Sequence, residues 1–367
     1  MGTVMTTTAP VLHVRDVGRD DVPRVGGKGA SLGELLRAGI RVPTGFAVTT
    51  AAFARAVGHL ALDGEPVAAR VAALDPADAE GVAAATARVR DVVASAPLPA
   101  DLADAIAAGY AALCDECGHP DLPVAVRSSA TGEDSAEDSF AGLQDTYLWV
   151  RGGDAVVASV RRCWASLYSA ESVTYRRRRG IPETDLRMAV VVQRMVDARS
   201  SGVMFTRSPV SGDRSVVAID ASWGLGSAVV GGDVTPDSFV VSKVTGEITR
   251  RTVATKTRWH RPDPSGSGVV EADVPEELRD RPSVSDAEIA ELVATARRVE
   301  EHYGCPQDVE WAVAESDGAV HLLQSRPETT WAERDAQRTA APVAVPSERA
   351  FDHVFALFGG KQPPARG

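Results

Sequence analysis

The sequence predicts a mixed α/β or α+β protein with two lobes, and two observations carry this prediction. Alanine-rich segments with helical patterns dominate the first part of the chain, and apolar strand-like segments with long connections dominate the second. This order of elements is typical of mixed sheets with packed helices. The chain has 367 residues, which is enough for two or three packed subdomains with their own cores.

The predicted helices begin near the N-terminus. A short helix is expected over about 30–38, and helices interrupted by Pro97 and Pro99 are expected over 51–118. A further single helix is expected over about 154–179. Alanine and apolar residues at helical spacing support each of these predictions.

The strands follow a different pattern. One strand begins at Val124, and apolar segments predict further strands at 188–196, 201–206, 215–223 and 239–243. The segment 261–282 is rich in proline, glycine, serine and acidic residues, which predicts a loop.

The last predicted helix has clear boundaries. Ser285 and Glu288 form a capping box, S-x-x-E, at its start. Apolar residues then recur at helical spacing from Ile289 to Tyr303, and Gly304 is expected to end the helix.

The segment QDVEWAVAESDGAVHLLQSRPET, residues 307–329, predicts a hairpin with its turn at 315–318. Alternation in the first strand separates an apolar face from a face formed by Asp308, Glu310 and Ala312. Strict alternation in the second strand places one set of residues on a common face: Val320, Leu322, Gln324 and Arg326. It places His321 on the face opposite Gln324, and we interpret this histidine as structural.

Polar residues at the end of an apolar face, beside two carboxylates, indicate a site at a sheet edge. Magnesium prefers oxygen ligands, so Asp308, Glu310 and the carbonyl of Gln324 could hold it, while Arg326 could contact a phosphate. The alternative is an exposed face with a surface ion pair. That alternative explains the carboxylates well but explains Gln324 and Arg326 less well.

Two further segments combine glycine with a cation. VGGKGASLGELL places a glycine pair before Lys28 and a helix, where a phosphate could approach the backbone, although the Walker pattern is absent. VAVRSSATGEDSAEDSFAGLQDT ends a strand at Arg127 and continues as a long loop of the kind that can close over a ligand. The alternatives are a solvated lysine and an arginine paired with an acid of its own loop.

Two other features have a functional and a structural interpretation. Cys114 and Cys117 have the C-x-x-C spacing of zinc and redox sites, but the lack of a second pair favours simple packing at a helix end. The run Arg176–Arg179 could bind nucleic acid or dock an acidic partner. Its position at a helix end in an acidic chain favours a solvated face.

Composition is that of an ordinary soluble globular protein, with 44% hydrophobic and 24% charged residues. The net charge of −11 argues against nucleic acid or an anionic membrane as the main partner. No apolar run reaches the length of a membrane-spanning helix, and the first residues lack the pattern of a signal peptide. We therefore expect a cytoplasmic protein.

Taken together, these segments resemble the N-terminal nucleotide-binding region of the phosphoenolpyruvate synthase and pyruvate phosphate dikinase family, which includes rifampicin phosphotransferases. The matching motifs are GGKGASLGEL, VPTGFAVTT, AVRSSATGEDS, SFAGLQDTYL, VVQRMV, SGVMFTRSP, ASWGLGSAVVGG, PDSF, DVEWA and LLQSRPET. The likeness covers about 11–331. It implies an ATP-grasp-like fold with nucleotide held between a lobe at 1–187 and a lobe at 188–331, followed by a tail at 332–367.

The resemblance also implies a site for ATP and Mg²⁺. The residues expected at the nucleotide are Lys28, Arg127, Gln193, Met195, Val196, Asp308, Glu310, Gln324 and Arg326. Among them, Lys28, Arg127 and Arg326 would act on the phosphates in catalysis. Glu310 and Gln324 would be magnesium ligands, and the backbone of 193–196 would contact adenine. The loop 140–146 would close over the phosphates.

The sequence departs from the family at Ser227, where GLG is commonly followed by a glutamate near the nucleotide, so ribose or metal affinity is in question. Leu143 replaces a glutamine that is common in the synthases. Full-length members also carry a phosphorylated histidine in a T-S-H-A-like motif, and none of the seven histidines here lies in such a motif. The chain also resembles the ATP-binding subunit of phenylphosphate synthase, in which another subunit carries the histidine. This resemblance implies a separate histidine-bearing partner protein.

The function implied is that of an ATP-binding phosphotransferase component. It would pass a phosphoryl group, the β-phosphoryl with release of AMP and phosphate, to the partner's histidine and then to pyruvate or another small molecule. One alternative is a stand-alone ATP-grasp kinase that acts directly on a small molecule and leaves ADP. Another is a non-catalytic nucleotide-binding module, degenerate at Ser227.

Overall fold

The computed structural model describes residues 9–131, 145–266, 268–332 and 334. These residues divide into a compact unit that ends at Glu328 and a second unit from Thr329 onward. In the second unit, the described backbone is helical at 330–332 and 334. Every element below belongs to the first unit, whose mixture of helices and strands confirms the predicted fold class.

The first sheet has five strands in the order β1-β2-β7-β5-β6, each antiparallel to its neighbours. Their bounds are β1 (Val11–His13), β2 (Gly45–Val48), β5 (Val124–Ala130), β6 (Thr146–Val150) and β7 (Met188–Arg194). The sheet extends beyond the lobe boundary expected at 187/188, because β7 pairs with β2 on one side and with β5 on the other.

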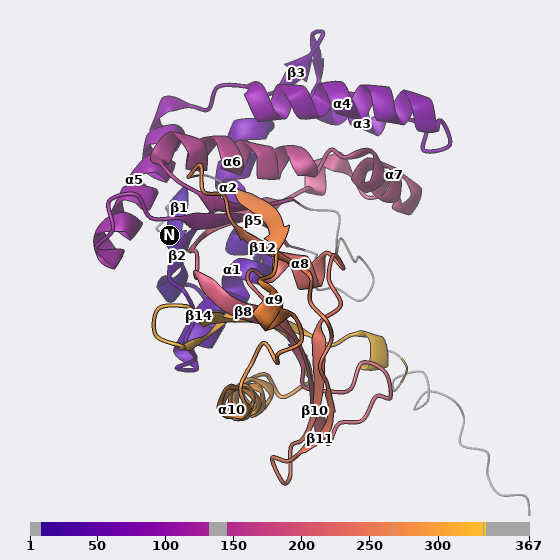
Figure 1. Cartoon of the computed structure of the whole chain (residues 1–367). Helices are drawn as coiled ribbons and strands as arrows, with labels where there is room; N and C mark the ends of the chain where they lie inside the picture. The colour runs from indigo at the N-terminus through magenta and orange to yellow at the C-terminus, as the bar shows by residue number, and fades with distance from the viewer. Residues whose placement is uncertain (1–8, 132–144, 267, 333, 335–367) are drawn as a thin grey trace, which may run out of the picture. The chain divides into compact units, whose positions relative to one another are not determined.

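Several helices are associated with this sheet, some packed against its strands and others packed on those helices. They are α2 (Thr50–Val57), α3 (Val67–Ala72), α4 (Ala79–Ser95), α5 (Ala100–Cys117), α6 (Gly153–Ser166) and α7 (Ala170–Arg179), with a short hairpin of β3 (Ala61–Leu62) and β4 (Glu65–Pro66) between α2 and α3. Figure 1 shows α4 and α6 side by side, and α6 packs against β5 and β7. The break between α4 and α5 falls at the predicted prolines.

The single helix expected over 154–179 is two helices. The Ser169 hydroxyl accepts a hydrogen bond of 3.1 Å from the amide of Ser172 and thereby caps the start of α7. A serine in this position satisfies one of the donors that a new helix leaves unpaired. Apolar residues occur at helical spacing on both sides of the break, so periodicity alone did not reveal it.

The second sheet has six antiparallel strands in the order β11-β10-β9-β8-β14-β15. Their bounds are β8 (Ala198–Phe205), β9 (Val216–Trp223), β10 (Asp237–Ser242), β11 (Ile248–Thr252), β14 (Gln307–Ala314) and β15 (Val320–Pro327). Helix α10 (Asp286–Tyr303) packs against β14 and β15. Both hydrogen bonds of its predicted capping box are present, and Gly304 ends it with a φ of 72°.

The segment 261–282, predicted as a loop, contains regular structure. A hairpin forms from β12 (Arg258–Pro262) and β13 (Val269–Asp273), and α9 (Glu276–Arg279) follows. The Arg258 side chain pairs with Glu271 and Asp273 across the hairpin. The composition agrees with the turn between the two strands. The residues on either side of the turn are strands because β13 pairs with β12, which composition does not indicate.

Helix α1 (Val22–Arg37) lies between the two sheets. It packs against β5 and β7 of the first sheet and against β15 of the second. Leu32 and Leu35 on this helix are buried in the same hydrophobic core as Trp311 of β14 and Phe239 of β10. One helix therefore contributes to the packing of both sheets.

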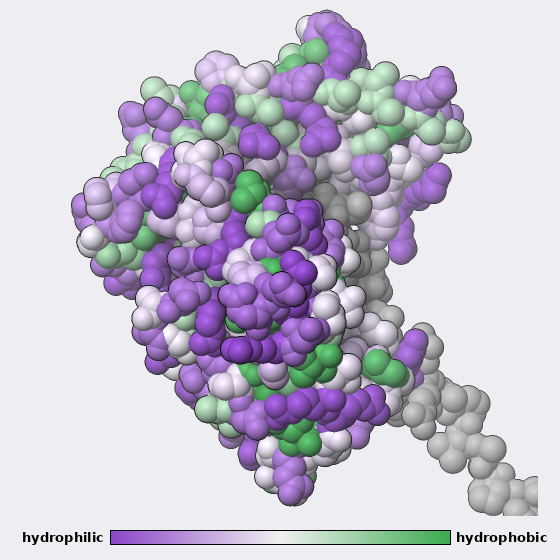
Figure 2. Space-filling model, viewed as in Figure 1, coloured by the Kyte–Doolittle hydropathy of each residue, from purple (hydrophilic) through white to green (hydrophobic). Residues whose placement is uncertain are grey.

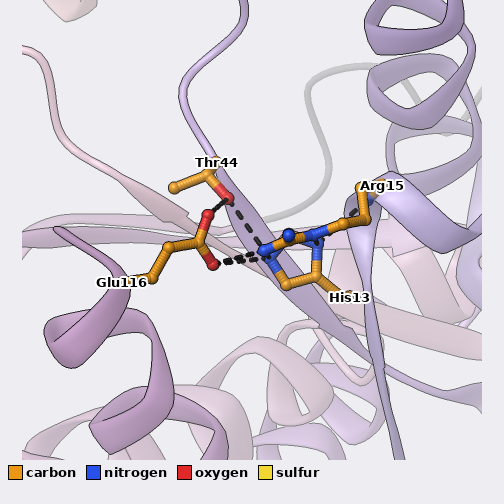
Figure 3. Close-up of polar contacts among 4 residues, drawn as sticks. All are labelled: His13, Arg15, Thr44 and Glu116. Atoms are coloured by element: carbon orange, nitrogen blue, oxygen red, sulfur yellow. Dashed lines mark hydrogen bonds and ion pairs between the residues drawn. The ribbon is translucent and has the colours of Figure 1, made fainter.

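A polar cluster joins three segments at the edge of the first sheet (Figure 3). Glu116, in the last turn of α5, accepts hydrogen bonds from Arg15 at 2.6 Å and Thr44 at 3.0 Å. His13, at the end of β1, lies 3.0 Å from the same carboxylate. The cluster ties the start of the chain and the segment before β2 to α5.

Most of the surface seen in Figure 2 is hydrophilic, with hydrophobic residues in small separate patches. Among the described residues, no single helix has the length and apolarity needed to cross a membrane. Helices α4 and α5 meet the length and composition criterion only as a pair, bent by 72° at their break.

Candidate functional site

The hairpin of β14 and β15 contains a bulge that changes the predicted faces. Trp311 pairs with Leu322, but Glu310 pairs with Gln324, so Leu323 is an extra residue on β15. Strict alternation placed Gln324 and Arg326 on the apolar face of Leu322, and this prediction is wrong. The bulge turns both side chains to the other face, where they lie opposite Glu310 and Asp308.

The same bulge changes the prediction for His321. This residue pairs with Ala312, so it lies on the same face as Gln324 rather than on the opposite one. The His321 side chain is buried, and its burial lowers the pKa. A buried, neutral imidazole agrees with the structural interpretation of His321.

The glycine pair before Lys28 brings α1 against β5. Gly26 has a φ of 69°, and a Cβ there would lie 2.1 Å from the carbonyl oxygen of Ser129. Ser129 in turn donates to the carbonyl of Val25 at 2.8 Å and accepts from the amide of Gly29 at 3.2 Å. Because Ser129 is two residues beyond Arg127, this close approach places Lys28 beside the strand that carries Arg127.

Arg127 links the first sheet to the hairpin of the second. Its guanidinium donates to Glu310 at 2.9 Å and to the amide oxygen of Gln324 at 2.6 Å. It also donates to the carbonyl of Leu323, the bulged residue, at 3.1 Å. The side chain is only 11% exposed. The acids of its own loop, at 133–138, lie outside the described residues, so the alternative pairing within that loop is not tested.

Asp308 and Arg326 form a second pair on this face, with Nε of Arg326 3.4 Å from Oδ2 of Asp308. Burial raises the pKa of Asp308, and the charge of Arg326 offsets only part of that effect. The other oxygen of Asp308 is buried and has no hydrogen-bond partner among the described residues. A buried carboxylate with an unsatisfied oxygen is costly, which suggests a ligand, ion or water at this position.

A cavity of about 460 Å³ lies between the two sheets and gathers most of the predicted residues. Its charged and polar lining includes Lys28, Arg127, Ser227, Glu310, Gln324 and Arg326. Its apolar lining includes Leu148, Met195, Val196, Ala198, Leu225 and Leu323. Asp308 does not line the cavity but lies beside it through its contact with Arg326. The apolar lining residues Met195, Val196, Ala198, Leu225 and Leu323 belong to one hydrophobic cluster, which gives the cavity an apolar side.

The predicted adenine-binding segment also reaches the cavity, since Gln193, Met195 and Val196 all line it. The Gln193 side chain is buried and donates to the carbonyl of Pro43 at 3.3 Å. The amide of Met195 donates to the carbonyl of Pro123 at 2.9 Å. Both donors already bind acceptors within the protein. A nucleobase would therefore contact the remaining backbone groups and the apolar side chains of this segment.

Sequence reasoning missed the apolar lining from other elements. Leu148 lies in the apolar segment TYLWV and Leu225 lies between two glycines, and no local signal distinguishes either as a cavity residue. Leu323 escaped notice because the bulge was not foreseen. His260, which contacts Ser227 at 2.8 Å, was passed over because it lies in no recognisable motif. Leu143 and most of the predicted closing loop, 140–144, lie outside the described residues.

The oxygen donors on this face fit a hard cation. Glu310 and Gln324 present a carboxylate and an amide oxygen to the cavity, the ligand types that Mg²⁺ accepts together with water and substrate phosphates. No cluster of three or more His, Cys, Asp or Glu side chains suited to a metal occurs in the described part of the chain.

Two remaining predictions concern residues outside the cavity. Cys114 is buried and Cys117 half-buried in the last turn of α5, which agrees with packing. The predicted solvated face at 176–179 is wrong for Arg176, which is fully buried and pairs with Glu183 at 3.2 Å. Its guanidinium also donates to the carbonyl of Leu167 at 2.6 Å, so this arginine holds the start of α7 in place.

Comparison with known sequences gives a consistent result. Residues 22–345 match the family described as pyruvate phosphate dikinase, AMP/ATP-binding domain. The chain is 45% identical over 325 residues to a probable phosphoenolpyruvate synthase of Methanothermobacter thermautotrophicus, a match that covers 88% of this chain and 46% of the relative. It is 44% identical over 322 residues to a rifampicin phosphotransferase of a Streptomyces species, covering 87% of this chain and 36% of the relative. The chain therefore spans less than half the length of these curated relatives.

Proposed function

The chain belongs to the family of pyruvate phosphate dikinase AMP/ATP-binding domains, and we propose that it binds Mg²⁺-ATP in the cavity between the two sheets. In this proposal, the chain is the ATP-binding component of a phosphotransferase. The observation that carries this proposal is the convergence of Arg127, Glu310 and Gln324 from different sheets at one end of that cavity. The two sheets would then form the two lobes around the nucleotide.

The two sides of the cavity suggest an orientation for the nucleotide. The apolar side, which includes Met195, Val196 and Leu225, suits the faces of a purine ring. Lys28, Arg127 and Arg326 supply cationic donors for the phosphates at the other end. A guanidinium has five N–H donors, and the contacts of Arg127 with protein use three of them. Arg127 can thus hold its protein partners and a phosphate at once.

Magnesium would be held by Glu310 and Gln324, and when bound it would neutralise charge on the phosphate oxygens. Asp308 lies beside them and fixes the side chain of Arg326. The residues of this chain bind and orient the phosphates in a half-buried site, where electrostatic interactions are stronger than in water. Positioning and charge stabilisation are most of what phosphoryl transfer requires of a protein.

The acceptor is proposed to be a histidine on a separate protein. The β-phosphoryl group would pass from ATP to that histidine with release of AMP, and water would take up the γ-phosphoryl group as free phosphate. The histidine would then pass its phosphoryl group to pyruvate or another small molecule. The support is that none of the seven histidines in the sequence lies in a motif suited to this role. His321 is buried, and neither it nor any other described histidine lines the cavity.

The binding step is tested by calorimetric titration of the purified chain with ATP in the presence and absence of magnesium. Glu310→Ala and Arg326→Ala should each weaken binding of Mg²⁺-ATP by about tenfold or more, because each removes a charged contact. Arg88→Ala is the matched control, since Arg88 forms an exposed pair with Asp63 at 2.9 Å and does not line the cavity. Full affinity in both site variants would refute the site.

The transfer step is tested by analysis of the nucleotide products. Incubation with magnesium and ATP should yield AMP only after a purified histidine-bearing domain of a phosphoenolpyruvate synthase is added. Rapid turnover by the chain alone would contradict the proposed partner. Formation of ADP with a small-molecule acceptor would instead favour direct phosphorylation.

A further inference from the structure

Ser227 and His260 form a hydrogen bond at the wall of the cavity. Ser227 is the first residue of α8 (Ser227–Val230) and lines the cavity. Its Oγ lies 2.8 Å from Nδ1 of His260 on β12. On the other side of the imidazole, Nε2 lies 3.6 Å from Oδ2 of Asp233. The three side chains form a row that begins at the cavity and ends at the exposed Asp233.

The backbone on both sides of this row is fixed. The carbonyl of His260 accepts a hydrogen bond of 2.9 Å from the amide of Leu225. Gly224 has a φ of 75°, and a Cβ there would lie 2.5 Å from the same carbonyl oxygen. The close approach of β12 to the loop before α8 therefore requires a glycine at 224. This contact holds His260 in reach of Ser227.

The carboxylate beside the ring favours one direction of the hydrogen bond for a neutral imidazole. Asp233 lies beside Nε2, and Glu271 pairs with His260 across the hairpin. A carboxylate beside Nε2 favours the tautomer that carries its proton there, which leaves Nδ1 as an acceptor. The Ser227 hydroxyl then donates to Nδ1. A hydroxyl has two acceptor lone pairs in addition to its one donor, so the oxygen of Ser227 is presented to the cavity as an acceptor.

We propose that Ser227, oriented by His260 and Asp233, accepts a hydrogen bond from a ribose hydroxyl of the nucleotide and makes the site prefer ribonucleotides over deoxyribonucleotides. This inference rests on the proposed function and adds a specificity-determining contact to it. Ser227 touches the ligand, and His260 is a positioning residue that acts through it.

The chemistry of the cavity supports this placement. Leu225, two residues before Ser227, belongs to the apolar side, where the base would lie. The sugar connects the base to the phosphates, so an uncharged polar group next to the apolar side meets the sugar rather than the phosphates. An uncharged acceptor also avoids the repulsion that a carboxylate would exert on nearby phosphates.

The test compares the dissociation constants of ATP, 2′-deoxy-ATP and 3′-deoxy-ATP, each with magnesium, for the full chain and its variants. In the parent chain, at least one deoxy analogue should bind about three- to tenfold more weakly than ATP, the loss expected for one hydrogen bond. In Ser227→Ala, the affinity for ATP should fall by a similar factor, and the ratio between ATP and that analogue should approach one. General damage to the site would weaken all three ligands and leave the ratio unchanged.

His260→Phe keeps an aromatic ring but removes Nδ1, so it should reduce the ratio by about twofold or more while circular dichroism confirms the fold. Two variants remote from the cavity are matched controls and should keep the parental ratio. They are Ser95→Ala, at the end of α4, and His59→Phe, an exposed histidine whose ring contacts the carbonyl of Arg55.

The outcomes separate this inference from the function on which it rests. If the parent chain binds none of the three nucleotides, both are overturned. If it binds all three equally, or if Ser227→Ala keeps the parental preference, only the ribose contact is overturned. A preference that is lost in Ser227→Ala but intact in His260→Phe would mean that Ser227 acts without its neighbours, and the positioning role of His260 would be wrong.

Discussion

A single guanidinium, that of Arg127 on the first sheet, contacts the β14–β15 hairpin of the second sheet. The residue itself stands out in the sequence because a strand ends there and a polar loop follows. Its partners do not, because Glu310 and Gln324 lie 183 and 197 positions away along the chain. Local patterns report which side chains are unusual for their position, but they carry no information on pairings over such distances. The types of residue at the site could thus be predicted, whereas their contacts could not.

Ser227 and Arg176 illustrate the same limit for single residues. Ser227 was expected to weaken the site because it stands where a carboxylate is usual, but its contact with His260 is visible only in three dimensions. Arg176 was expected to face solvent as part of an arginine run. It is buried because one position of each helical turn faces the core, and Glu183 neutralises its charge there.

Glu116 in the cluster of Figure 3 gives a prediction for pH dependence. Its burial acts to raise the pKa, but hydrogen bonds from His13 and Thr44 outweigh this and hold the pKa below its ordinary value. A carboxylate with a lowered pKa in the folded state stabilises the protein above its unfolded pKa, and the effect is lost as pH falls through the folded value. Because the side chain is 36% exposed, the contribution should stay below about 1 kcal/mol.

The measurement is urea unfolding of the parent chain and Glu116→Gln at pH 7, 5 and 3. Glu116→Gln should be less stable at pH 7 and 5, and the difference should shrink towards pH 3 as the parent carboxylate takes up its proton. Glu301→Gln, on the exposed side of α10, serves as the control. An equal difference at all three pH values would show that lost packing, not the charge of Glu116, causes the effect.

At the scale of an element, the β14–β15 hairpin shows where periodicity succeeds and where it fails. The first strand alternates as predicted, with Val309, Trp311 and Val313 buried. In the second strand, Leu322 and Leu323 are adjacent, so either could continue the apolar face. Backbone pairing selects Leu322 for the core and leaves Leu323 as the bulged residue beside the cavity. Because Leu322 and Leu323 are identical, the sequence pattern does not indicate that one of them is bulged.

This interpretation predicts an asymmetry between two deletions in β15. Deletion of Leu323 leaves a regular strand in which Gln324 and Arg326 still face Glu310 and Asp308, so the protein should fold with a loss of no more than about 2 kcal/mol. Binding of Mg²⁺-ATP should weaken about threefold or more, because the cavity loses an apolar side chain and Arg127 loses the carbonyl it contacts.

Deletion of Ser325 is the matched control, since it shortens the same strand by one residue. It would place Arg326 opposite Val309 on the core face, where an unpaired charge costs several kcal/mol. We expect this variant to be largely unfolded by circular dichroism and thermal denaturation. If both deletions destabilise the protein equally, the bulge at Leu323 does not determine which face of β15 carries Gln324 and Arg326.

At the scale of the whole unit up to Glu328, the strand order is the feature least accessible to sequence reasoning. The capping box of α10 was predicted at its observed position, and seven strands were predicted close to theirs: β5, β7, β8, β9, β10, β14 and β15. The edge strands of the first sheet and the hairpin of β12 and β13 were not predicted. The place of β7 between β2 and β5 was not, because β7 follows β5 by nearly sixty residues and joins β2 across more than a hundred. An apolar strand of this kind fits the centre of either sheet, and only tertiary packing decides between them.

The arrangement of the two sheets leads to a prediction for the unit as a whole. They share helix α1 and the Arg127 contacts, and the cavity between them is lined from both. A ligand that binds only the folded state stabilises it by about 2.7 kcal/mol at a hundred times its dissociation constant. Saturating Mg²⁺-ATP should therefore raise the unfolding temperature by roughly 5 °C.

Removal of the metal distinguishes nucleotide binding from general effects of added ATP. Excess EDTA should reverse most of the rise in unfolding temperature, because Glu310 and Gln324 would then face the phosphates without a cation between them. Glu310→Ala should show little rise at the same nucleotide concentration. Its unfolding temperature without ligand is the reference for this comparison. A rise that survives EDTA, or that is equal in Glu310→Ala, would contradict the prediction. It would mean that the stabilising nucleotide binds outside the cavity.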